Sequence, residues 1–374
     1  MKKLKVLMVG GAMNVGGQEN QIVNVIRYAD KNQFQIDFTT TVENPFYRQE
    51  IESLGGKCIK IPDMDWTCPW VYCKELSRVI KEGKYDIVHG HELFHTGITL
   101  MIAAKAKVPI RIAHSHSGSD GNGTGRTFVR RIYNYLMKHM ILHYATELIA
   151  CSTSAGEFLY GKESLNAENY HLIFNSVDTE KFMEPYGKMG SLCIEKNWKS
   201  VLHVGHMIPL KNQDFLVDIA EVLKKKGSKI RIYSVGPGDE KYIAYVKDKI
   251  KKKKLENQMV LLGLRKDVPD LMKKADAFVL PSRYEGMPLV MIEAQASGLP
   301  CVAADTFSRE VDFGTNQIHW MKLEEGAEAW ANALVAATNK SRAKKRDVMN
   351  AIQEKGFDSK LFAEKIFDVY ENEI

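Results

Sequence analysis

Two glutamates, Glu285 and Glu293, bracket a loop and the start of an apolar helix in the segment Pro-Ser-Arg-Tyr-Glu-Gly-Met-Pro-Leu-Val-Met-Ile-Glu-Ala. Pro288 suits a first helical turn, and Gly298 followed by Leu-Pro predicts the helix end. The N–H groups and dipole of that helix N-terminus favour an anion. A carboxylate in an apolar helix is costly unless hydroxyls or charges meet it. Phosphate at the helix end and sugar hydroxyls at the carboxylates would make a nucleotide-sugar site.

A lysine and two turns in the second half of the chain add to this pattern. Lys211 lies between a predicted strand at 200–204 and a predicted helix at 213–225, where it could offset pyrophosphate charge. A glycine-containing turn at 235–238 and the pair Leu264-Arg265 follow other predicted strands. Each signal is weak alone. Together they line one rim of one predicted domain, because the carboxyl ends of parallel strands share one edge of a sheet.

The first half of the chain offers a glycine turn and a histidine-rich stretch. Gly16 and Gly17 follow the first predicted strand and would let backbone approach a ligand. The dinucleotide fingerprint G-x-G-x-x-G is absent, which argues against NAD. His114 and His116 follow a predicted strand at 110–113, so each is either a hydrogen-bonding group at the ligand edge or part of a polar loop.

Two patterns could indicate metal, and we favour neither. His89, His91 and His95, with a glutamate between them, have a spacing that could bind zinc, but nothing nearby completes a closed ligand set. The D-x-D pattern at 63–65 matches a metal-binding pattern of one class of sugar transferases, yet it reads better as a loop. We therefore expect no metal and no cofactor.

The chain of 374 residues is too long for one ordinary core. Short apolar segments alternate with helical patterns, as in parallel sheets covered by helices. We predict two Rossmann-like, doubly wound α/β domains facing a cleft, at 1–175 and 200–358, with a polar linker at 176–199. A last amphipathic helix within 359–374 could pack on either domain.

Composition narrows the class of protein. Six cysteines are scattered without a C-x-x-C pair, which predicts a reduced, cytoplasmic protein. The apolar run at 6–9 is too short for a signal peptide, and no stretch reaches the ~20 apolar residues of a membrane span. The net charge of +6 is mild, and the basic tracts read as solvated helix faces, so we expect no nucleic acid partner.

The motifs occur in an order that resembles the family-4 retaining glycosyltransferases of the GT-B fold, especially the group that builds bacterial exopolysaccharides and capsules. The E-x7-E signature is the most specific, and the likeness extends over nearly all of the chain. The other similar motifs are Gly16-Gly17-x-Glu19, Asp86-Ile-Val-His89-Gly-His91, Arg111-Ile-Ala-His114-Ser-His116-Ser, Asn175-Ser-Val-Asp178 and Gly205 through Lys211-Asn212.

The resemblance implies roles for matching positions. Glu293 would hold the ribose hydroxyls of the donor, and Glu285 would contact the transferred sugar. Lys211 would stabilise the β-phosphate as the glycosidic bond breaks. His116 would lie near the sugar ring, with His114 as the competing assignment. The remaining implied donor-binding residues are Gly16, Gly17, His206, Leu264, Arg265, Gly286, Met287, Pro288 and Leu289.

The implied activity is transfer of a hexose, with retention, from a nucleoside diphosphate sugar (UDP by default) to a hydroxyl of an acceptor glycan. The acceptor would be lipid-linked, in surface polysaccharide synthesis. Alternatives are a nucleotide-sugar epimerase of the same fold or a non-catalytic sugar-nucleotide-binding subunit. His206 keeps the latter open, because the family commonly has arginine there and histidine is a weaker cation.

A lipid-linked acceptor would place the protein at the inner face of the cell membrane. A segment that begins with Arg126 and Arg130 is basic, contains aromatics, and has no acid before Glu147. It is either an exposed helix on the acceptor side or a peripheral membrane-docking face.

Overall fold

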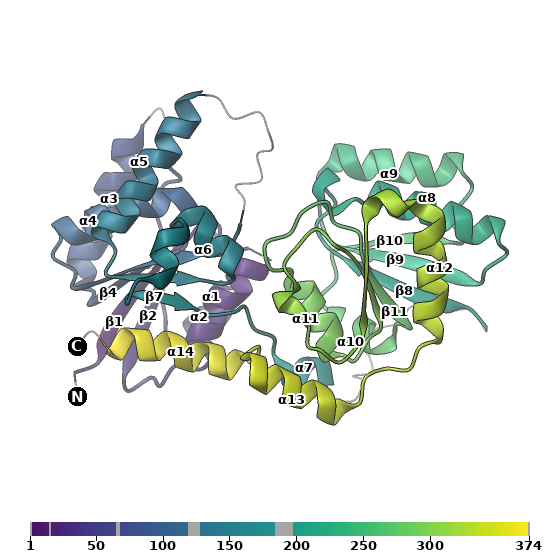
Figure 1. Ribbon diagram of the computed structural model, residues 1–374. Coiled ribbons are helices and arrows are strands. Elements are labelled where there is room, and N and C mark those ends of the chain that lie inside the picture. Colours follow the sequence, from purple (N-terminus) through teal and green to yellow (C-terminus); the bar gives the residue numbers. More distant parts are fainter. Residues whose placement is uncertain (1, 15, 65–67, 119–127, 184–196, 373–374) are drawn as a thin grey trace. The chain divides into compact units, whose positions relative to one another are not determined.

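The computed structural model describes residues 2–14, 16–64, 68–118, 128–183 and 197–372 (Figure 1). The chain divides into two compact domains: the first comprises Met1–Ser176 with Ser359–Ile374, and the second comprises Val177–Asp358. Each contains one parallel sheet, so the predicted fold class is confirmed. None of the described helices is long and apolar enough to cross a membrane.

The first domain has a seven-stranded sheet in the order β3-β2-β1-β4-β5-β6-β7. Its strands are β1 (Leu4–Val9), β2 (Phe34–Thr40), β3 (Cys58–Lys60), β4 (Ile87–Gly90), β5 (Ile110–Ser115), β6 (Glu147–Ala150) and β7 (Tyr170–Leu172). Its helices are α1 (Gly17–Arg27), α2 (Arg48–Ser53), α3 (Pro69–Gly83), η1 (Leu93–His95), α4 (Thr96–Lys105), α5 (Phe128–Tyr144), α6 (Thr153–Leu159), η2 (Lys162–Asn166) and α14 (Ser359–Glu371).

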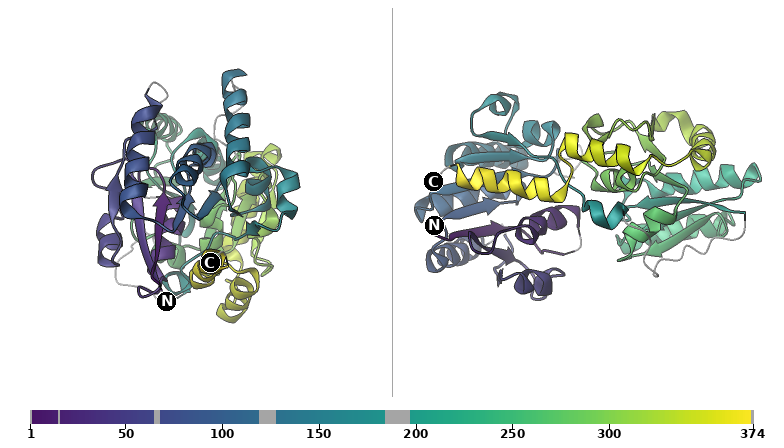
Figure 2. Two further views of the ribbon diagram at one scale, coloured as in Figure 1. Left: turned by 90° about the vertical axis from the view of Figure 1, so that its left-hand side faces the viewer. Right: turned by 90° about the horizontal axis from the view of Figure 1, so that it is seen from below.

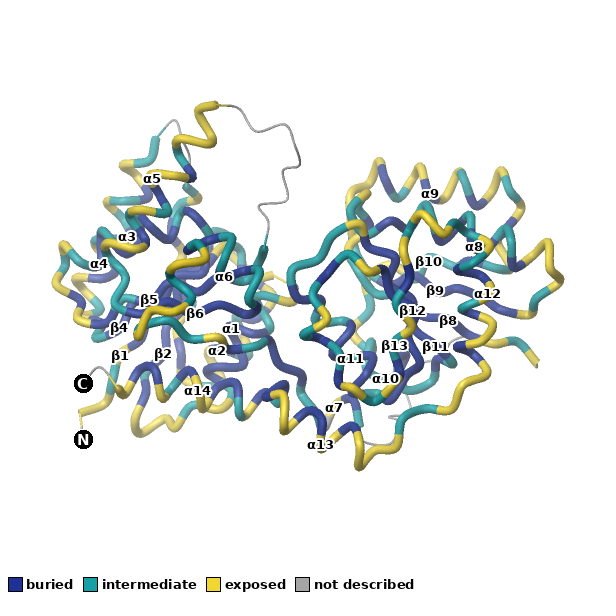
Figure 3. Tube along the Cα trace, viewed as in Figure 1, coloured by how far each residue is buried: buried dark blue, intermediate teal, exposed yellow. Residues whose placement is uncertain are grey.

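Side-chain alternation along β1 sends residues to both faces of this sheet. Val6 and Met8 enter a core that α1 and α14 cover, whereas Leu7 and Val9 enter a second core that α3 and α4 cover. The yellow helix α14 lies along the first domain (Figure 2), and Phe362 is among its buried side chains. The C-terminal helix therefore completes the first domain. Strands β1, β2, β4, β5 and β6 are buried along most of their length (Figure 3), whereas the edge strands β3 and β7 are only partly buried.

The second domain has a six-stranded sheet in the order β10-β9-β8-β11-β12-β13. Its strands are β8 (Lys199–Val204), β9 (Ile230–Val235), β10 (Met259–Gly263), β11 (Ala277–Leu280), β12 (Cys301–Ala304) and β13 (Ile318–Met321). Its helices are α7 (Thr179–Met183), η3 (Pro209–Lys211), α8 (Gln213–Lys225), α9 (Glu240–Lys252), α10 (Val268–Lys274), α11 (Leu289–Ala296), η4 (Arg309–Val311), η5 (Leu323–Glu325), α12 (Gly326–Asn339) and α13 (Lys345–Lys355).

The segment predicted as a linker, 176–199, is not uniformly a connection. Its helix α7 packs against α10 and α11 within the second domain, β8 starts at its end, and 184–196 lies outside the described residues.

Both sheets reverse their strand order at one point, between β1 and β4 in the first domain and between β8 and β11 in the second. Ligands of doubly wound sheets bind at the carboxyl ends of strands beside such a reversal, because the two loops there turn apart. The loops after β8 and β11 carry Lys211 and Glu285. The loop after β1 carries Gly16, and the residues after β4 begin with His91.

Candidate active site

Lys211 and Glu285 form an ion pair at the reversal point of the second sheet. The ammonium nitrogen of Lys211 lies 2.6 Å from each carboxylate oxygen of Glu285. The Lys211 and Glu285 side chains are 21% and 9% exposed. Ser282 donates a further hydrogen bond to Glu285 at 2.7 Å. The pair keeps two poorly solvated charges neutralised, since removing either partner would leave an uncompensated charge.

Asn212 ties the two loops together. It adopts a left-handed backbone conformation with φ of 63° between η3 and α8. Its side-chain amide donates to the Pro281 carbonyl at 3.0 Å, and its amide oxygen accepts from the Arg283 guanidinium at 2.9 Å. Asn212 therefore fixes where Lys211 and Glu285 meet. Sequence reasoning assigned no role to Asn212 or Ser282, although an asparagine directly after the lysine and a serine three residues before the glutamate are the available signals.

Glu293 lies on α11 with its side chain partly exposed. Burial of its carboxyl raises its pKa to about 7. Among the residues that the structure describes, none hydrogen-bonds or pairs with this carboxyl. Such a group can accept hydrogen bonds from ligand hydroxyls, which suits the role that the resemblance implies.

The start of α11 differs in one detail from the prediction. Pro288 has an extended conformation, with φ of −72° and ψ of 103°, and α11 begins one residue later at Leu289. Pro288 thus caps the helix rather than lying in its first turn, because its ψ is not helical. The N–H groups of Gly286, Met287 and Leu289 donate to no described residue, so they remain available to an anion. Gly298, with φ of 69°, ends the helix as predicted.

Three other predicted donor-binding residues of the second domain, His206, Leu264 and Arg265, differ in their exposure and partners. His206 is exposed, and its carbonyl accepts from the Gln213 side chain at 2.8 Å. Leu264 is 52% exposed. Arg265 pairs with Asp267 at 2.5 Å, so its guanidinium is already engaged.

The glycines of the turn at 235–238 have a structural reason. A Cβ on Gly236 would lie 2.1 Å from the Gly205 carbonyl oxygen, and one on Gly238 would lie 2.3 Å from Met207. The turn therefore packs directly against the loop that leads to Lys211. Its glycines therefore permit contact between two loops of the protein, whereas the sequence pattern had indicated a turn that approaches a ligand.

In the first domain, Gly16 caps α1 in an extended conformation with φ of −166°. A Cβ there would lie 2.0 Å from the Glu19 carboxylate, so a larger residue would require the flexible Glu19 side chain to move. Gly17 is exposed and opens the helix. The side chain of Gln18 donates to the His91 carbonyl at 2.9 Å and thereby joins this turn to the end of β4.

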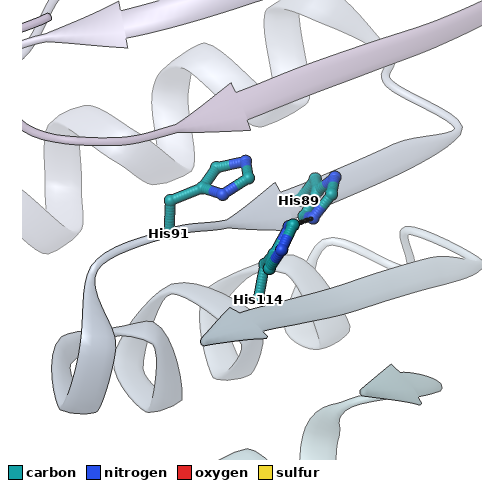
Figure 4. A group of neighbouring side chains, drawn as sticks. All are labelled: His89, His91 and His114. Atoms are coloured by element: carbon teal, nitrogen blue, oxygen red, sulfur yellow. Dashed lines mark hydrogen bonds between the residues drawn. The ribbon is translucent and has the colours of Figure 1, made fainter. Parts of the chain in front are cut away.

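Four histidines gather beside this turn. His89, His91 and His114 are buried, at 0%, 4% and 2% exposure, and His116 is partly buried. The imidazoles contact one another: His114 Nδ1 lies 3.2 Å from His89 Nε2, drawn as a dashed line in Figure 4, and His91 Nδ1 lies 2.9 Å from His116 Nε2. Burial lowers the pKa of all four, to about 3 for His116, so the rings are neutral.

The structure changes the set of histidines that could bind zinc. Ligand nitrogens of His89, His91 and His114 lie within 4.8 Å of one another, whereas His95 stacks edge-on against Tyr133. His114 thus takes the place that spacing gave to His95, because β4 and β5 are neighbours in the sheet. The imidazoles are engaged by one another, and a hydrogen-bonded cluster accounts for their arrangement without a metal ion.

Of the two arginines predicted on the acceptor side, Arg130 is exposed on α5 and Arg126 lies outside the described residues. Asp65 of the D-x-D pattern also lies outside the described residues.

The two parallel sheets and the Lys–Glu site define a glycosyltransferase of the GT-B type. Residues 15–181 match the family described as "Glycosyltransferase Family 4", and residues 199–340 match "Glycosyl transferases group 1". EpsF of Bacillus subtilis (strain 168), named as a glycosyltransferase, is 33% identical over 375 residues, covering 98% of this chain and 96% of EpsF. The chain therefore belongs to the family-4 and group-1 glycosyltransferases.

Two further relatives have names that specify a reaction or a polysaccharide. The Escherichia coli UDP-Gal:α-D-GlcNAc-diphosphoundecaprenol α-1,3-galactosyltransferase is 30% identical, covering 71% of this chain and 69% of that protein. The Staphylococcus aureus capsular polysaccharide biosynthesis glycosyltransferase CapH is 26% identical, covering 78% of each.

Solved structures share the fold. Anabaena HepE in complex with UDP and glucose superposes with a TM-score of 0.78 at 17% identity, covering 98% of this chain and 99% of HepE. The lipopolysaccharide glycosyltransferase WaaG superposes with a TM-score of 0.72 at 14% identity, covering 98% and 99%.

Proposed function

We propose that this glycosyltransferase moves a hexose from a UDP-sugar to a hydroxyl of a lipid-linked glycan, with retention of configuration, in surface polysaccharide synthesis. The observation that carries the proposal is the Lys211–Glu285 pair beside the free amides at the start of α11. A cation, amide donors and carboxylates side by side match a diphosphate joined to a sugar. The UDP donor and the lipid diphosphate acceptor named for the Escherichia coli relative support the substrate classes.

Ligand binding would exchange partners within the pair. The diphosphate takes the N–H donors of Lys211, and the Glu285 carboxylate then accepts hydrogen bonds from sugar hydroxyls. As the bond between C1 and the β-phosphate oxygen breaks, negative charge grows on that phosphate, and Lys211 stabilises it. The acceptor oxygen attacks C1 on the face that the phosphate leaves, and its proton passes to a phosphate oxygen. Lysine and backbone amides supply the charge stabilisation, so we propose that no metal is required.

Transfer to an acceptor distinguishes this proposal from the alternatives. Purified protein would be incubated with each member of a UDP-sugar panel, with and without a diphosphate-lipid glycan acceptor. We expect UDP release that depends on the acceptor. A change of sugar configuration without UDP release would indicate the epimerase, and binding without either reaction would indicate a non-catalytic subunit.

We also propose that α5 docks on an anionic membrane surface at the cytoplasmic face. Phe128, Val129 and Tyr135 on this helix are 77%, 74% and 60% exposed. Arg130 and Arg131 lie among them, both exposed, and the helix contains no acidic residue. Exposed apolar and basic side chains on one helix suit anionic headgroups with an apolar layer beneath.

Vesicle flotation tests the docking proposal. The protein should float with vesicles that contain anionic lipid and less with neutral ones. Replacing Phe128 and Tyr135 by serine should reduce flotation, whereas Tyr245→Ser, at a 52% exposed tyrosine of the second domain, should not. Equal flotation of all three proteins would refute a docking role for α5.

A further inference from the structure

A thioether lies at the inner end of one pair of histidines in the first domain. Met8, in the middle of β1, is 1% exposed. Its sulfur lies 3.4 Å from His91 Nε2. The opposite nitrogen of His91, Nδ1, lies 2.9 Å from His116 Nε2. Met8, His91 and His116 therefore form one chain of contacts, which ends at His116 Nδ1.

The chemistry of sulfur sets the protons along this chain. A thioether accepts hydrogen bonds and cannot donate them, so the favourable arrangement places the proton of His91 on Nε2. A neutral imidazole has one N–H, so His91 Nδ1 carries a lone pair and accepts from His116 Nε2–H. His116 then has no proton on Nδ1. The proton positions on the other imidazole nitrogens therefore follow from the proton on His91 Nε2.

Burial favours the same assignment. His116 Nδ1 is buried and has no hydrogen-bond partner among the described residues. With the opposite tautomers it would be a buried N–H without an acceptor, which is rarer and costlier in proteins than an unpaired acceptor. In that arrangement two lone pairs would also face each other, at His91 Nε2 and the Met8 sulfur.

We propose that Met8 is a positioning residue that fixes the tautomers of His91 and His116, so that His116 Nδ1 presents a lone pair to a sugar hydroxyl. This inference rests on the proposed function for the identity of the ligand. A bare lone pair can accept only from a donor group, and sugar hydroxyls are donors. Phosphate and carboxylate oxygens are acceptors, so this nitrogen discriminates against them. His116 Nδ1 is itself buried, although the residue is partly exposed, so a hydroxyl can reach this nitrogen only after the groups that cover it have moved on ligand binding.

Tautomer state is measurable without any substrate. In protein labelled with ¹⁵N- and ¹³C-histidine, imidazole NMR signals distinguish Nδ1–H from Nε2–H. We expect Nε2–H at both His91 and His116. Met8→Leu keeps side-chain volume and removes the acceptor, so both histidines should then populate Nδ1–H. Met137→Leu, at a buried methionine of α5, is the matched control and should leave both signals unchanged.

Three results would overturn the inference: Nδ1–H at either histidine in the wild type, unchanged tautomers in Met8→Leu, or a stoichiometric metal ion whose chelation shifts the His91 signals. For activity, Met8→Leu should raise KM for the nucleotide sugar about tenfold, as for one hydrogen bond, and leave the affinity for UDP unchanged. Equal weakening of UDP would also overturn it. If the wild type transfers no sugar, the proposed function fails, whereas the tautomer measurement still decides the role of Met8.

Discussion

The two domains differ in the charge of the side chains that lie where their parallel sheets reverse strand order. Each domain places polar side chains at this reversal point. The second domain places a charged pair there, Lys211 with Glu285, whereas the first places neutral imidazoles around His91. The ion pair retains some exposure, and the buried imidazoles would pay a large desolvation cost if charged. Under the proposed function, the charged pair would serve both the diphosphate, through Lys211, and the sugar hydroxyls, through Glu285, whereas the neutral imidazoles could form only neutral hydrogen bonds.

The largest expected difference between the two domains is in how their free energy of unfolding changes on acidification. The pKa of His116 is lowered from 6.5 to about 3, so between these values the unfolded chain binds a proton that the folded chain does not. The free energy of unfolding therefore falls as the pH is lowered through this window, by up to about 1.4 kcal/mol per pH unit. His89, His91 and His114 act in the same direction, and Glu92, whose pKa burial raises, offsets part of this.

Two shifts oppose each other in the second domain. His203 has a pKa lowered to about 3 and loses stability on acidification. Glu293 has a pKa raised from 4.5 to about 7, so the folded state holds its proton between these values and gains stability as the pH falls. From about pH 7.5 to about pH 5, the hydrogen-exchange protection factors, corrected for the intrinsic rate at each pH, should fall in β5 well before β9. A parallel fall in both strands would contradict the comparison.

Core truncations should act on one domain at a time. Phe362→Ala on α14 removes a 1% exposed side chain from the core of the first domain and should cost about 3–5 kcal/mol. Trp330→Ala on α12 is its counterpart in the second domain, with a wild-type exposure of 0%. Hydrogen exchange should increase in the domain that carries each substitution. Loss of protection throughout the chain from either one would show that the domains unfold together.

Replacing Lys211 tests the role of the charged site in the second domain. Lys211→Ala should lower kcat about 10²–10³-fold, the effect of losing one electrostatic donor in a transition state. Lys225→Ala removes a lysine of α8 that is 72% exposed in its pair with Glu221 and should leave kcat unchanged. Both variants should keep the circular dichroism of the wild type. Near-normal transfer by Lys211→Ala would exclude this lysine from the reaction.

The smallest expected effect is a gain. His206→Arg introduces the cation that the family commonly has, at an exposed position. We expect UDP to bind about two- to fivefold more tightly at low salt, as for an exposed ion pair, and the gain to shrink at high salt. Titration calorimetry at two ionic strengths measures both. Unchanged affinity at low salt would place His206 away from the phosphates.

Local sequence predicted the elements better than the contacts between them. The fold class and the E-x7-E helix follow from short-range patterns, and α8 has the predicted bounds of 213–225. The four-residue strand β13, Ile-His-Trp-Met, was missed because it has neither length nor alternation. The Lys211–Glu285 pair joins residues from separate loops, so spacing could nominate both but not pair them.

The histidine cluster shows the same limit of local sequence patterns, which do not reveal contacts between distant segments. His114 replaced His95 in it because β4 and β5 are neighbours, which no local pattern reveals. Met8 reads in sequence as an ordinary strand residue, and its contact with His91 spans 83 positions. Tyr370, whose hydroxyl lies 2.8 Å from His89 Nδ1, comes from the far end of the chain. Sequence thus names the reactive residues, and tertiary structure assigns their partners.

The position of α14 has a consequence for the order of events on the ribosome. The first domain lacks Phe362 and Tyr370 until the last helix emerges, although its other strands and helices are synthesised before residue 177. The second domain, by contrast, is continuous and is complete once residue 358 has emerged. Domains generally fold as units during synthesis, the N-terminal one first. Here synthesis of the first domain begins first, but its folding can be completed only after α14 has been synthesised. Until then the face of its sheet that carries His89 lacks the covering helix, while the second domain can already fold.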